Sequence, residues 1–330
     1  MRRVISGEVG PEEIGAFLGS LRTRGESLDE LVGFARALRA TALRLPDSME
    51  FPLPVSRLDN CGTGGDESGT FNISTAASFV VAAAGVPVAK HGNRSVSSLC
   101  GSVDVLEALG VATDLAPADV ARALSTLGYG FLFAQRFHPA LKGVAGIRRA
   151  LGVRTVFNLL GPLINPAPVD LQLMGVYDPA WVVPLAGALG ELGVRRALVV
   201  CGEFSDLSAG SDSDAASVRV DELSLCGVTD AAWLSDGQVQ AMRLTPEDAG
   251  LARARPEALR GGDARQNAEL IERILGGEKG APRDVVVLNA GAALWVAGLD
   301  ADLRAGARRA EQVLDSGSAR NLLARLRAFR

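Results

Sequence analysis

Residues 90–98, KHGNRSVSS, gather many hydrogen-bond donors in one short stretch of chain. Gly92 can bend the backbone among them, and Val96 is the one side chain of the stretch that cannot donate a hydrogen bond. The donors are Lys90, His91, Asn93, Arg94, Ser95, Ser97 and Ser98. Donors of this kind, several of them cationic, suit a ligand rich in anionic oxygen.

A glycine-rich segment, DNCGTGGDESGTFNISTAAS, lies upstream of that stretch at 59–78. Its glycines Gly62, Gly64 and Gly65 can take positive φ and let the backbone approach a ligand closely. The NIST motif at 72–75 then supplies good N-cap residues for an alanine-rich helix. Free amides at a helix N-terminus bind anions, so this segment is a second candidate for the same ligand.

Two well-known glycine-rich signatures do not fit the segment. A dinucleotide-binding fingerprint would need glycine at Glu67, and a phosphate-binding P-loop would need Lys where Thr70 follows Gly69. Neither cofactor is therefore implied. Taken by itself, the segment also fits a simpler interpretation, a capped helix after a tight turn.

The elements that must position these residues alternate between strands and helices. Apolar periodicity predicts helices over the first 45 or so residues, and prolines at 46, 52 and 54 mark a connector. Beyond it, strands are predicted at 86–89, 129–133, 171–177, 197–202 and 285–289, and helices at 117–127, 179–192 and 264–275. This alternation predicts an α/β fold with a mostly parallel sheet. Loops at the carboxyl ends of neighbouring parallel strands converge, so both donor-rich segments are expected at one crevice.

Composition narrows the function further. A chain of 330 residues suits a large domain with a smaller one. The net charge of −4 argues against a protein that binds nucleic acid through general electrostatic attraction. The longest apolar stretch, 78–89, is too short to span a membrane, and the polar start does not resemble a secretory signal. Four cysteines without a C-x-x-C pair indicate reduced thiols and a cytoplasmic protein. Only two histidines are present, which disfavours a histidine-based zinc site.

Seven motifs together resemble the anthranilate phosphoribosyltransferase family over nearly the whole chain. They are GTGGD (62–66), NIST (72–75), KHGNRSVSS (90–98), HPALK (138–142), RTVFNLLGPLINP (154–166), DELS (221–224) and TPEDAGL (245–251). The resemblance implies transfer of the 5-phosphoribosyl group of phosphoribosyl pyrophosphate (PRPP) to anthranilate, with release of pyrophosphate, the second step of tryptophan synthesis from chorismate.

The resemblance also implies a domain division. A small α-helical domain is expected at 1–50, joined by helices from about 139–165. A large α/β domain that binds the phosphoribosyl donor is expected at 51–330, with the active site between the two. The family's N-terminal helices commonly form a homodimer, and a homodimer is the expected assembly.

By resemblance, the donor is bound from the two donor-rich segments. The implied residues are Gly62, Gly65, Asp66, Thr70, Asn72, Ile73, Ser74, Thr75, Lys90, His91, Gly92, Asn93, Arg94, Ser95, Val96, Ser97, Ser98 and Ser102. Simpler interpretations stay open for some of them: Arg94 as a surface arginine, and Ser97 or Ser98 as helix caps.

The resemblance further implies Mg²⁺ as cofactor, with two ions. Ser74, Asp221 and Glu222 match the family's metal-site residues, and oxygen ligands suit Mg²⁺. An adjacent Asp-Glu pair is otherwise an ordinary solvated turn. This chain departs from the family here, because a Ser/Asp-rich segment at 204–219 replaces a short glycine-rich loop. We expect that segment to be a flexible surface loop, and its Asp206, Asp212 and Asp214 are rival metal ligands.

The acceptor, a flat aromatic amino acid, needs a partner for its carboxylate. Arg148 matches the family's anthranilate-binding arginine, although a helix arginine that covers apolar surface is the simpler interpretation. The other implied acceptor residues are Gly62, Asn93, His138 and Pro162. His138 also fits a capping role before Pro139. An aromatic amine is neutral at pH 7, so no single catalytic acid or base is expected, and catalysis is assigned to positioning and leaving-group stabilisation.

Asn60 and Cys61 are a further departure, since the family has apolar residues before GTGGD. Three other functions stay open from the sequence. One is a pyrimidine nucleoside phosphorylase, which would show a different Gly/Ser signature and no Asp-Glu pair. Another is a nucleic-acid-binding relative, which would need a basic face. The third is a transferase acting on another aromatic acceptor.

Overall fold

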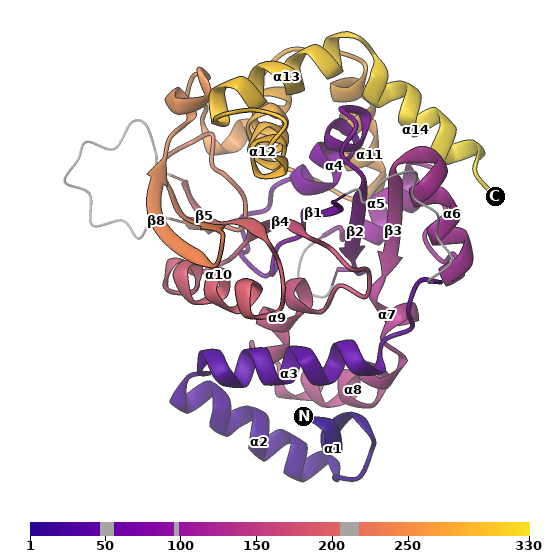
Figure 1. Ribbon diagram of the computed structural model, residues 1–330, viewed down its shortest axis with the longest axis vertical. Coiled ribbons are helices and arrows are strands. Elements are labelled where there is room, and N and C mark those ends of the chain that lie inside the picture. The colour runs from indigo at the N-terminus through magenta and orange to yellow at the C-terminus, as the bar shows by residue number, and fades with distance from the viewer. Residues whose placement is uncertain (47–55, 96–98, 205–217) are drawn as a thin grey trace.

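The computed structural model describes residues 1–46, 56–95, 99–204 and 218–330 (Figure 1). The α-helices are α1 (Arg2–Ile5), α2 (Pro11–Arg24), α3 (Leu28–Thr41), α4 (Ile73–Ala83), α5 (Ser102–Ala108), α6 (Pro117–Leu127), α7 (Ala134–Phe137), α8 (Lys142–Leu151), α9 (Val156–Leu160), α10 (Val182–Glu191), α11 (Ala264–Leu275), α12 (Ala281–Ala297), α13 (Leu303–Asp315) and α14 (Ser318–Ala328). Short 3₁₀ helices are η1 (Pro139–Leu141), η2 (Gly161–Ile164), η3 (Pro179–Trp181), η4 (Pro246–Ala249) and η5 (Pro256–Leu259).

The described strands form one sheet. They are β1 (Leu58–Asp59), β2 (Val88–Gly92), β3 (Tyr129–Phe133), β4 (Leu171–Gly175), β5 (Arg196–Phe204), β6 (Val218–Val220), β7 (Thr229–Ser235) and β8 (Gln238–Leu244). The order is β3-β2-β1-β4-β5-β7-β8, with β6 also paired to β5. The pairs from β3 to β5 are parallel, and β6, β7 and β8 add antiparallel pairs. The predicted α/β class with a mostly parallel sheet is confirmed.

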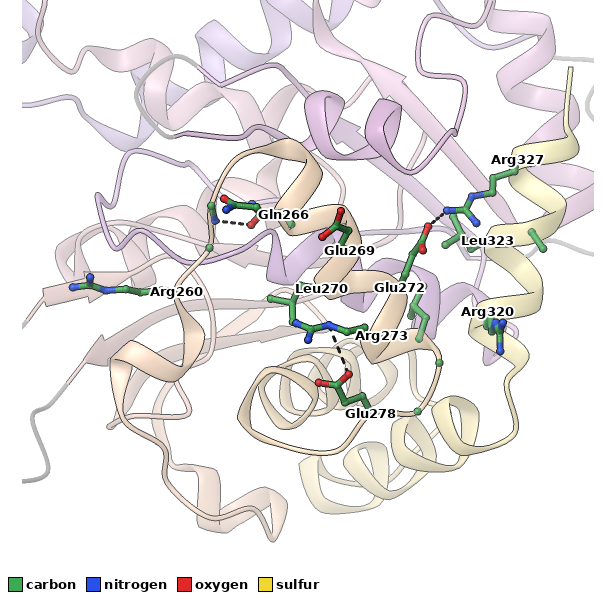
Figure 2. A pocket seen from close by; sticks show the side chains of 17 residues that line it. Arg260, Gln266, Glu269, Leu270, Glu272, Arg273, Glu278, Arg320, Leu323 and Arg327 are labelled. Carbon is green, nitrogen blue, oxygen red and sulfur yellow. Dashed lines mark hydrogen bonds and ion pairs between the residues drawn. The ribbon is translucent and has the colours of Figure 1, made fainter.

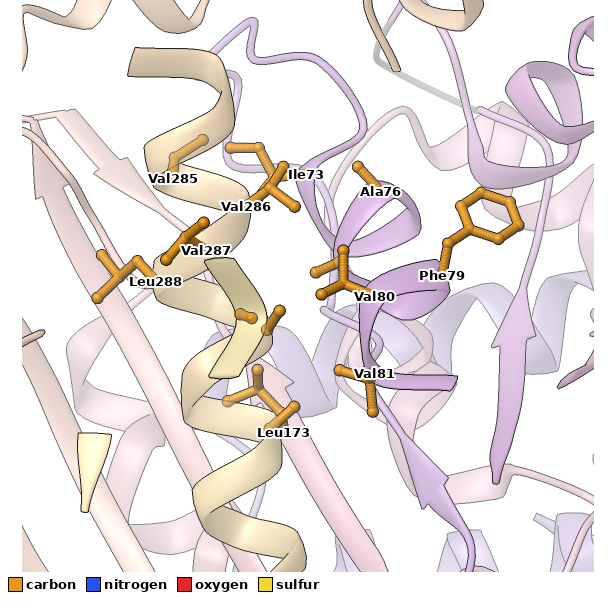
Figure 3. Packing of buried hydrophobic residues seen from close by; sticks show 14 of the residues in the cluster. Ile73, Ala76, Phe79, Val80, Val81, Leu173, Val285, Val286, Val287 and Leu288 are labelled. Atoms are coloured by element: carbon orange, nitrogen blue, oxygen red, sulfur yellow. The ribbon is translucent and has the colours of Figure 1, made fainter. Parts of the chain in front are cut away.

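Helices cover both faces of the sheet (Figure 1). On one face, α4 and α12 pack side by side over the strands, and their apolar side chains meet at Ile73, Val80 and Val286 (Figure 3). On the other face lie α9 and α10, and the same buried cluster extends to α2 and α3. The core therefore holds the central strands rigidly, and their carboxyl ends with them.

The N-terminal helices α2 and α3 lie against α8 and α9, which come from the segment expected to join them (Figure 1). The small N-terminal helical domain and the large α/β domain of the predicted fold class are confirmed, whereas the boundary expected at residue 50 lies outside the described residues and stays a prediction. In the described part of the chain, no helix is both long and apolar enough to cross a membrane. All four cysteines are buried.

One predicted strand is wrong. Residues 285–289, VVVLN, lie inside α12, a helix buried on nearly every side between α4, α13 and the sheet. A short apolar run cannot be assigned to a strand or to a fully buried helix by periodicity, because both are apolar all round.

The antiparallel edge also differs from the sequence prediction. The hairpin of β7 and β8 was not predicted, although Asp236 and Gly237 between them both have positive φ, as an Asp-Gly hairpin turn requires. The expected loop at 204–219 is wrong at both ends, because Phe204 pairs with Val218 and Arg219 lies in β6. Residues 205–217, with Asp206, Asp212 and Asp214, lie outside the described residues.

Candidate active site

The glycine-rich loop continues directly from the end of β1. Gly62 forms an isolated parallel bridge with Gly175 of β4, and the Thr63 amide donates to the Gly175 carbonyl over 2.9 Å. Gly64 and Gly65 have φ values of +65° and +74°, as the sequence predicted from the glycines. The loop therefore lies at the carboxyl ends of β1 and β4, in the centre of the sheet.

The Asp221–Glu222 turn lies against this loop. The Gly64 amide donates to Asp221 Oδ2 over 2.7 Å, and the Asp221 amide donates to Asp66 Oδ2 over 3.3 Å. A Cβ on Gly175 would stand 1.5 Å from the Asp221 carbonyl oxygen, and a Cβ on Gly62 would stand 2.2 Å from Asp221 Oδ2. Only glycine at both positions permits this close approach.

The N-terminus of α4 meets the second carboxylate of the turn. The Ser74 amide donates to Glu222 Oε1 over 3.0 Å, so Glu222 satisfies one of the free amides of the helix. Asn72 occupies the N-cap position but makes no side-chain cap. Its Nδ2 donates to the Cys100 carbonyl and its Oδ1 accepts from Asn267.

Three donor residues of this segment turn away from the ligand side or pair elsewhere. Ile73 lies in the hydrophobic core. Thr75 is 1% exposed, and its hydroxyl has no hydrogen-bond partner among the described residues. Thr70 forms an isolated bridge with Arg260. Of residues 72–75, the amides at the start of α4 and the half-buried Ser74 hydroxyl are therefore best placed to meet a ligand.

Three carboxylates gather at this edge. Burial raises the pKa of Asp221 well above its usual range, and repulsion from Asp66 and Glu222 raises it further. Burial raises the pKa of Glu222 to about 7, against the opposing effect of Lys90 and the Ser74 amide. A cation would relieve this repulsion. No three His, Cys, Asp or Glu side chains of the described residues form a ready-made metal site, but Mg²⁺ keeps several waters and needs only one or two protein carboxylates beside a phosphate. The oxygen donors of Asp221, Glu222 and Ser74 fit such an ion.

Lys90 and His91 lie in β2, and their side chains are buried. Lys90 is 1% exposed, and its Nζ donates to the Asn60 carbonyl at 2.8 Å and lies 3.3 Å from Ser74 Oγ. His91 is 5% exposed, and its Nδ1 lies 3.1 Å from the Gly161 carbonyl oxygen. Both side chains are therefore buried beneath the candidate site, whereas a surface that binds a ligand directly would be exposed.

The loop after β2 folds back on the start of α5. Gly92 is required there, because a Cβ would stand 2.3 Å from Ser102 Oγ. Ser102 Oγ donates to the Asn93 carbonyl over 3.2 Å. The Arg94 guanidinium pairs with Asp104 and with Glu107 at 2.7–3.0 Å, the arrangement expected of the surface-arginine interpretation. The Ser95 amide donates to Asp104. Val96, Ser97 and Ser98 lie outside the described residues.

The acceptor residues fall on α8 and η2. Arg148 is half-buried, and its guanidinium lies 5.3 Å from the centroid of the Phe157 ring. Within the described residues, this guanidinium makes no hydrogen bond or ion pair. Burial lowers its pKa from the usual value. Arg149, the adjacent residue, is exposed. A cation that is removed from water without an anion is poised to receive a carboxylate.

The two histidines form a buried pair. The ring centroids of His91 and His138 are 5.4 Å apart, and His138 Nε2 lies 2.9 Å from the Ile164 carbonyl oxygen. Burial lowers the pKa of His91 to about 3 and that of His138 to about 4. His138 makes no side-chain cap before Pro139. Pro162 is buried, and its carbonyl accepts from Gln172 over 2.8 Å. Both rings are therefore neutral at pH 7.

Two residues that join the halves of the site were not predicted. Arg154 donates to the Gly65 carbonyl, and its guanidinium lies 4.5 Å from the centroid of the Tyr177 ring. Asp59 is fully buried and accepts from the His91 amide at 3.2 Å and from Asn165 Nδ2 at 2.8 Å. Arg154 opens the RTVFNLLGPLINP motif, which was the available signal. Asp59 precedes the glycine-rich loop, but nothing in the local pattern shows its partners.

A groove of about 1390 Å³ lies elsewhere, between α11 and α14 (Figure 2). Arginines and glutamates line it, and two of them, Glu272 and Arg327, pair across it. Asn267 belongs to the lining and donates to Asn72, so the groove lies behind the start of α4. Of the predicted site residues that the structure describes, none lines this groove. The candidate site is therefore defined by the convergence of side chains at the carboxyl ends of the central strands, not by this groove.

Comparisons with known proteins cover the same chain. Residues 1–42 match the helical bundle domain of a glycosyl transferase family. Residues 55–320 match the a/b domain of a glycosyl transferase family. The chain is 50% identical over 324 residues to the anthranilate phosphoribosyltransferase of Azorhizobium caulinodans, which covers 98% of this chain and 88% of that protein.

Two solved structures are similar over nearly the whole chain. A crystal structure of anthranilate phosphoribosyltransferase from Thermus thermophilus is 46% identical with a TM-score of 0.87, covering 99% of this chain and 92% of that one. The Saccharomyces cerevisiae enzyme in complex with PRPP and Mg is 26% identical with a TM-score of 0.82, covering 96% of this chain and 84% of that one.

Proposed function

The chain belongs to the glycosyl transferase family and, within it, to the anthranilate phosphoribosyltransferases, the pentosyltransferases of tryptophan synthesis, and we propose that it performs their reaction at the carboxyl ends of the central strands β1 and β4. The 5-phosphoribosyl group of PRPP passes to the amine of anthranilate, and pyrophosphate leaves. One observation carries this proposal. The glycine-rich loop, the start of α4 and the Asp221–Glu222 turn converge at the carboxyl ends of β1 and β4.

The donor side has the chemistry that a diphosphate requires. Backbone amides of the glycine-rich loop and of the start of α4 face this edge, and a helix N-terminus stabilises negative charge. Lys90 places a cation beneath them, bonded to Ser74 Oγ. The other donor contacts that the resemblance implied, from Gly62 to Ser102, stay part of this proposal.

Mg²⁺ is the proposed cofactor, with two ions. The mutual repulsion of Asp66, Asp221 and Glu222 supports a cation here. The yeast relative binds PRPP and Mg, which agrees with this assignment. When bound, Mg²⁺ supplies charge that stabilises the departing pyrophosphate. Ser74, Asp221 and Glu222 would hold it.

The acceptor carboxylate is assigned to Arg148, whose guanidinium has no anionic partner in the described residues. Gly62, Asn93, His138 and Pro162 complete the proposed acceptor site. The amine nitrogen forms a bond to C1 of the ribose as the C1–O bond to pyrophosphate breaks, and the amine then loses one proton to solvent. His91 and His138 are weak bases at their lowered pKa values, so the protein contributes position and charge stabilisation.

We also propose a homodimer and a cytoplasmic location. The family resemblance of the N-terminal helices supports the homodimer, and four scattered cysteines without a C-x-x-C pair support the cytoplasmic location. Light scattering of the purified chain tests the assembly: a mass of twice 34.3 kDa is expected.

The experiment for the function is a steady-state assay. The chain is mixed with PRPP, anthranilate and Mg²⁺, and the loss of anthranilate fluorescence is followed together with released pyrophosphate. One pyrophosphate for each anthranilate consumed is expected. A parallel reaction with thymidine and phosphate tests the nucleoside phosphorylase alternative. Phosphorolysis of thymidine without consumption of anthranilate would refute the proposal.

A further inference from the structure

Asn60 lies between β1 and the glycine-rich loop and is 2% exposed. Its side-chain amide faces two residues of the donor side. Asn60 Nδ2 donates to the Ser74 carbonyl over 2.7 Å, and Asn60 Oδ1 accepts from Lys90 Nζ over 3.4 Å. The Asn60 backbone carbonyl accepts from the same ammonium over 2.8 Å. One residue therefore contacts both the start of α4 and the cation beneath it.

The Lys90 ammonium has three N–H groups and three oxygen partners. Two of these oxygens belong to Asn60, and the third is Ser74 Oγ at 3.3 Å. An ammonium that is removed from water needs every N–H satisfied, because each unmade bond is costly. The position of the charge is thus set by Asn60 on one side and by Ser74 on the other.

Carboxylates near the Lys90 ammonium compensate its charge without bonding to it directly. Burial lowers the pKa of Lys90, and the attraction of the fully buried Asp59 carboxylate, with smaller contributions from Glu222 and Asp221, opposes that shift. Asp59 makes no hydrogen bond to Lys90; it accepts from the His91 amide, from Asn165 and from Cys61. Asp59 supplies compensating charge, and Asn60 supplies direction.

From this geometry we propose that Asn60 is a positioning residue for the phosphoribosyl donor. It holds the Lys90 ammonium against Ser74 Oγ and ties the first turn of α4 to the end of β1. Asn60 does not touch the donor itself. It acts by keeping the cation and the Ser74 hydroxyl in register with the amides that receive the diphosphate.

An apolar residue at position 60 would keep the backbone carbonyl but remove both amide contacts. One Lys90 N–H would lose its partner, and the Ser74 carbonyl would lose a donor. The Lys90–Oδ1 bond is long, so we expect the loss typical of an ordinary hydrogen bond, about three- to tenfold in affinity for the diphosphate. Acceptor binding should not change, because the contacts of Asn60 that carry this argument reach only Ser74 and Lys90 of the donor side.

The test compares Asn60→Leu with the wild-type chain by two measurements. Steady-state kinetics gives KM for PRPP and KM for anthranilate. Titration calorimetry with inorganic pyrophosphate, in EDTA and without metal, gives a dissociation constant that does not depend on turnover. We expect both the KM for PRPP and the pyrophosphate dissociation constant to rise about three- to tenfold, with the KM for anthranilate within about twofold. If the leucine variant does not fold, Asn60→Ser replaces it, because serine is too short to reach Lys90. This variant should also raise the KM for PRPP and the pyrophosphate dissociation constant while leaving the KM for anthranilate nearly unchanged.

Gln172→Leu is the matched control for loss of a buried amide. Gln172 is fully buried on the neighbouring strand β4 and bonds Pro162, with no contact to Lys90 or Ser74. Its pyrophosphate affinity should equal that of the wild type. Equal weakening in both variants, a joint rise of both KM values in Asn60→Leu, or no change in pyrophosphate affinity would overturn the inference. It rests on the proposed donor site: if the wild-type chain fails to turn over PRPP at all, the proposed function fails, whereas an active wild type with an unaffected Asn60 variant refutes the positioning role alone.

Discussion

The chain contains only two histidines, and both are buried, so its histidine-linked stability can be measured with little interference. The perturbation is a change of pH from 7.5 to 5. Burial lowers the pKa of His91 to about 3 and that of His138 to about 4, against an ordinary value of 6.5 in the unfolded chain. Both rings stay neutral in the folded protein at pH 5.

The sign follows from proton binding. Between pH 6.5 and the lowered pKa values, the unfolded chain binds protons that the folded chain does not, so acid favours unfolding. At pH 5 each histidine lowers the free energy of unfolding by about 2 kcal/mol relative to pH 7.5, and the pair by about 4 kcal/mol. The loss is complete only below pH 3.

A difference measurement is needed because Glu222 acts in the opposite direction. Its pKa is raised to about 7, so its contribution to stability is present at low pH and is lost as pH rises through 7. His91→Asn and His138→Gln keep a donor where Nδ1 and Nε2 now meet carbonyls, and neither new side chain titrates. Urea denaturation of the wild type and of the double variant at pH 5, 6 and 7.5 cancels the carboxylate effect, which both proteins share.

The wild type should lose about 4 kcal/mol more than the double variant between pH 7.5 and pH 5. Parallel curves for the two proteins would show that the histidines are protonated in the folded chain. The buried, neutral pair described here would then be wrong.

Two further predictions concern the Asp221–Glu222 turn. Asp221→Asn combined with Glu222→Gln should lower activity at limiting Mg²⁺ by about tenfold or more while stabilising the metal-free chain at pH 8, because carboxylate repulsion is removed; initial rates and thermal melting check this, and near-normal rates would exclude the pair as metal ligands. Gly175→Ala should lower the free energy of unfolding by about 1–3 kcal/mol, since its Cβ would meet the Asp221 carbonyl. Gly143→Ala, in α8 with no atom near the added Cβ, should raise it by up to about 1 kcal/mol, and equal effects of the two substitutions in urea denaturation would argue against the close approach.

Much of the fold could be predicted because its signals are local. The strand at 129–133 and the helices at 117–127 and 264–275 have the bounds that periodicity indicates. The strand predicted at 285–289 is wrong for a non-local reason. The surrounding helices and the sheet bury α12 on nearly every side, so its residues are apolar all round and show no helical periodicity. The β7–β8 hairpin was missed although its signal is local. Asp236 and Gly237 form the turn, but the residues on either side were not recognised as strands.

The candidate site divides in the same way. The glycine-rich loop and the start of α4 are found from residue types, because backbone geometry and anion binding depend on adjacent residues. The bond from Gly64 to Asp221 joins residues 157 positions apart, and no local pattern contains it. The burial of Lys90 and the pairing of Arg94 with α5 likewise depend on tertiary packing, which residue type alone does not indicate.

The central proposal is that the Arg148 guanidinium on α8, which has no anionic partner among the described residues, receives the acceptor carboxylate. Arg148→Ala tests it most directly, with KM measured for anthranilate and for PRPP, and with Arg149→Ala as control because adjacent helix residues point to different faces. A charge-assisted bond to one substrate predicts about a ten- to hundredfold loss in kcat/KM for anthranilate, little change in KM for PRPP, and near-normal kinetics for Arg149→Ala. Equal effects of the two substitutions, or a loss confined to PRPP, would contradict the account.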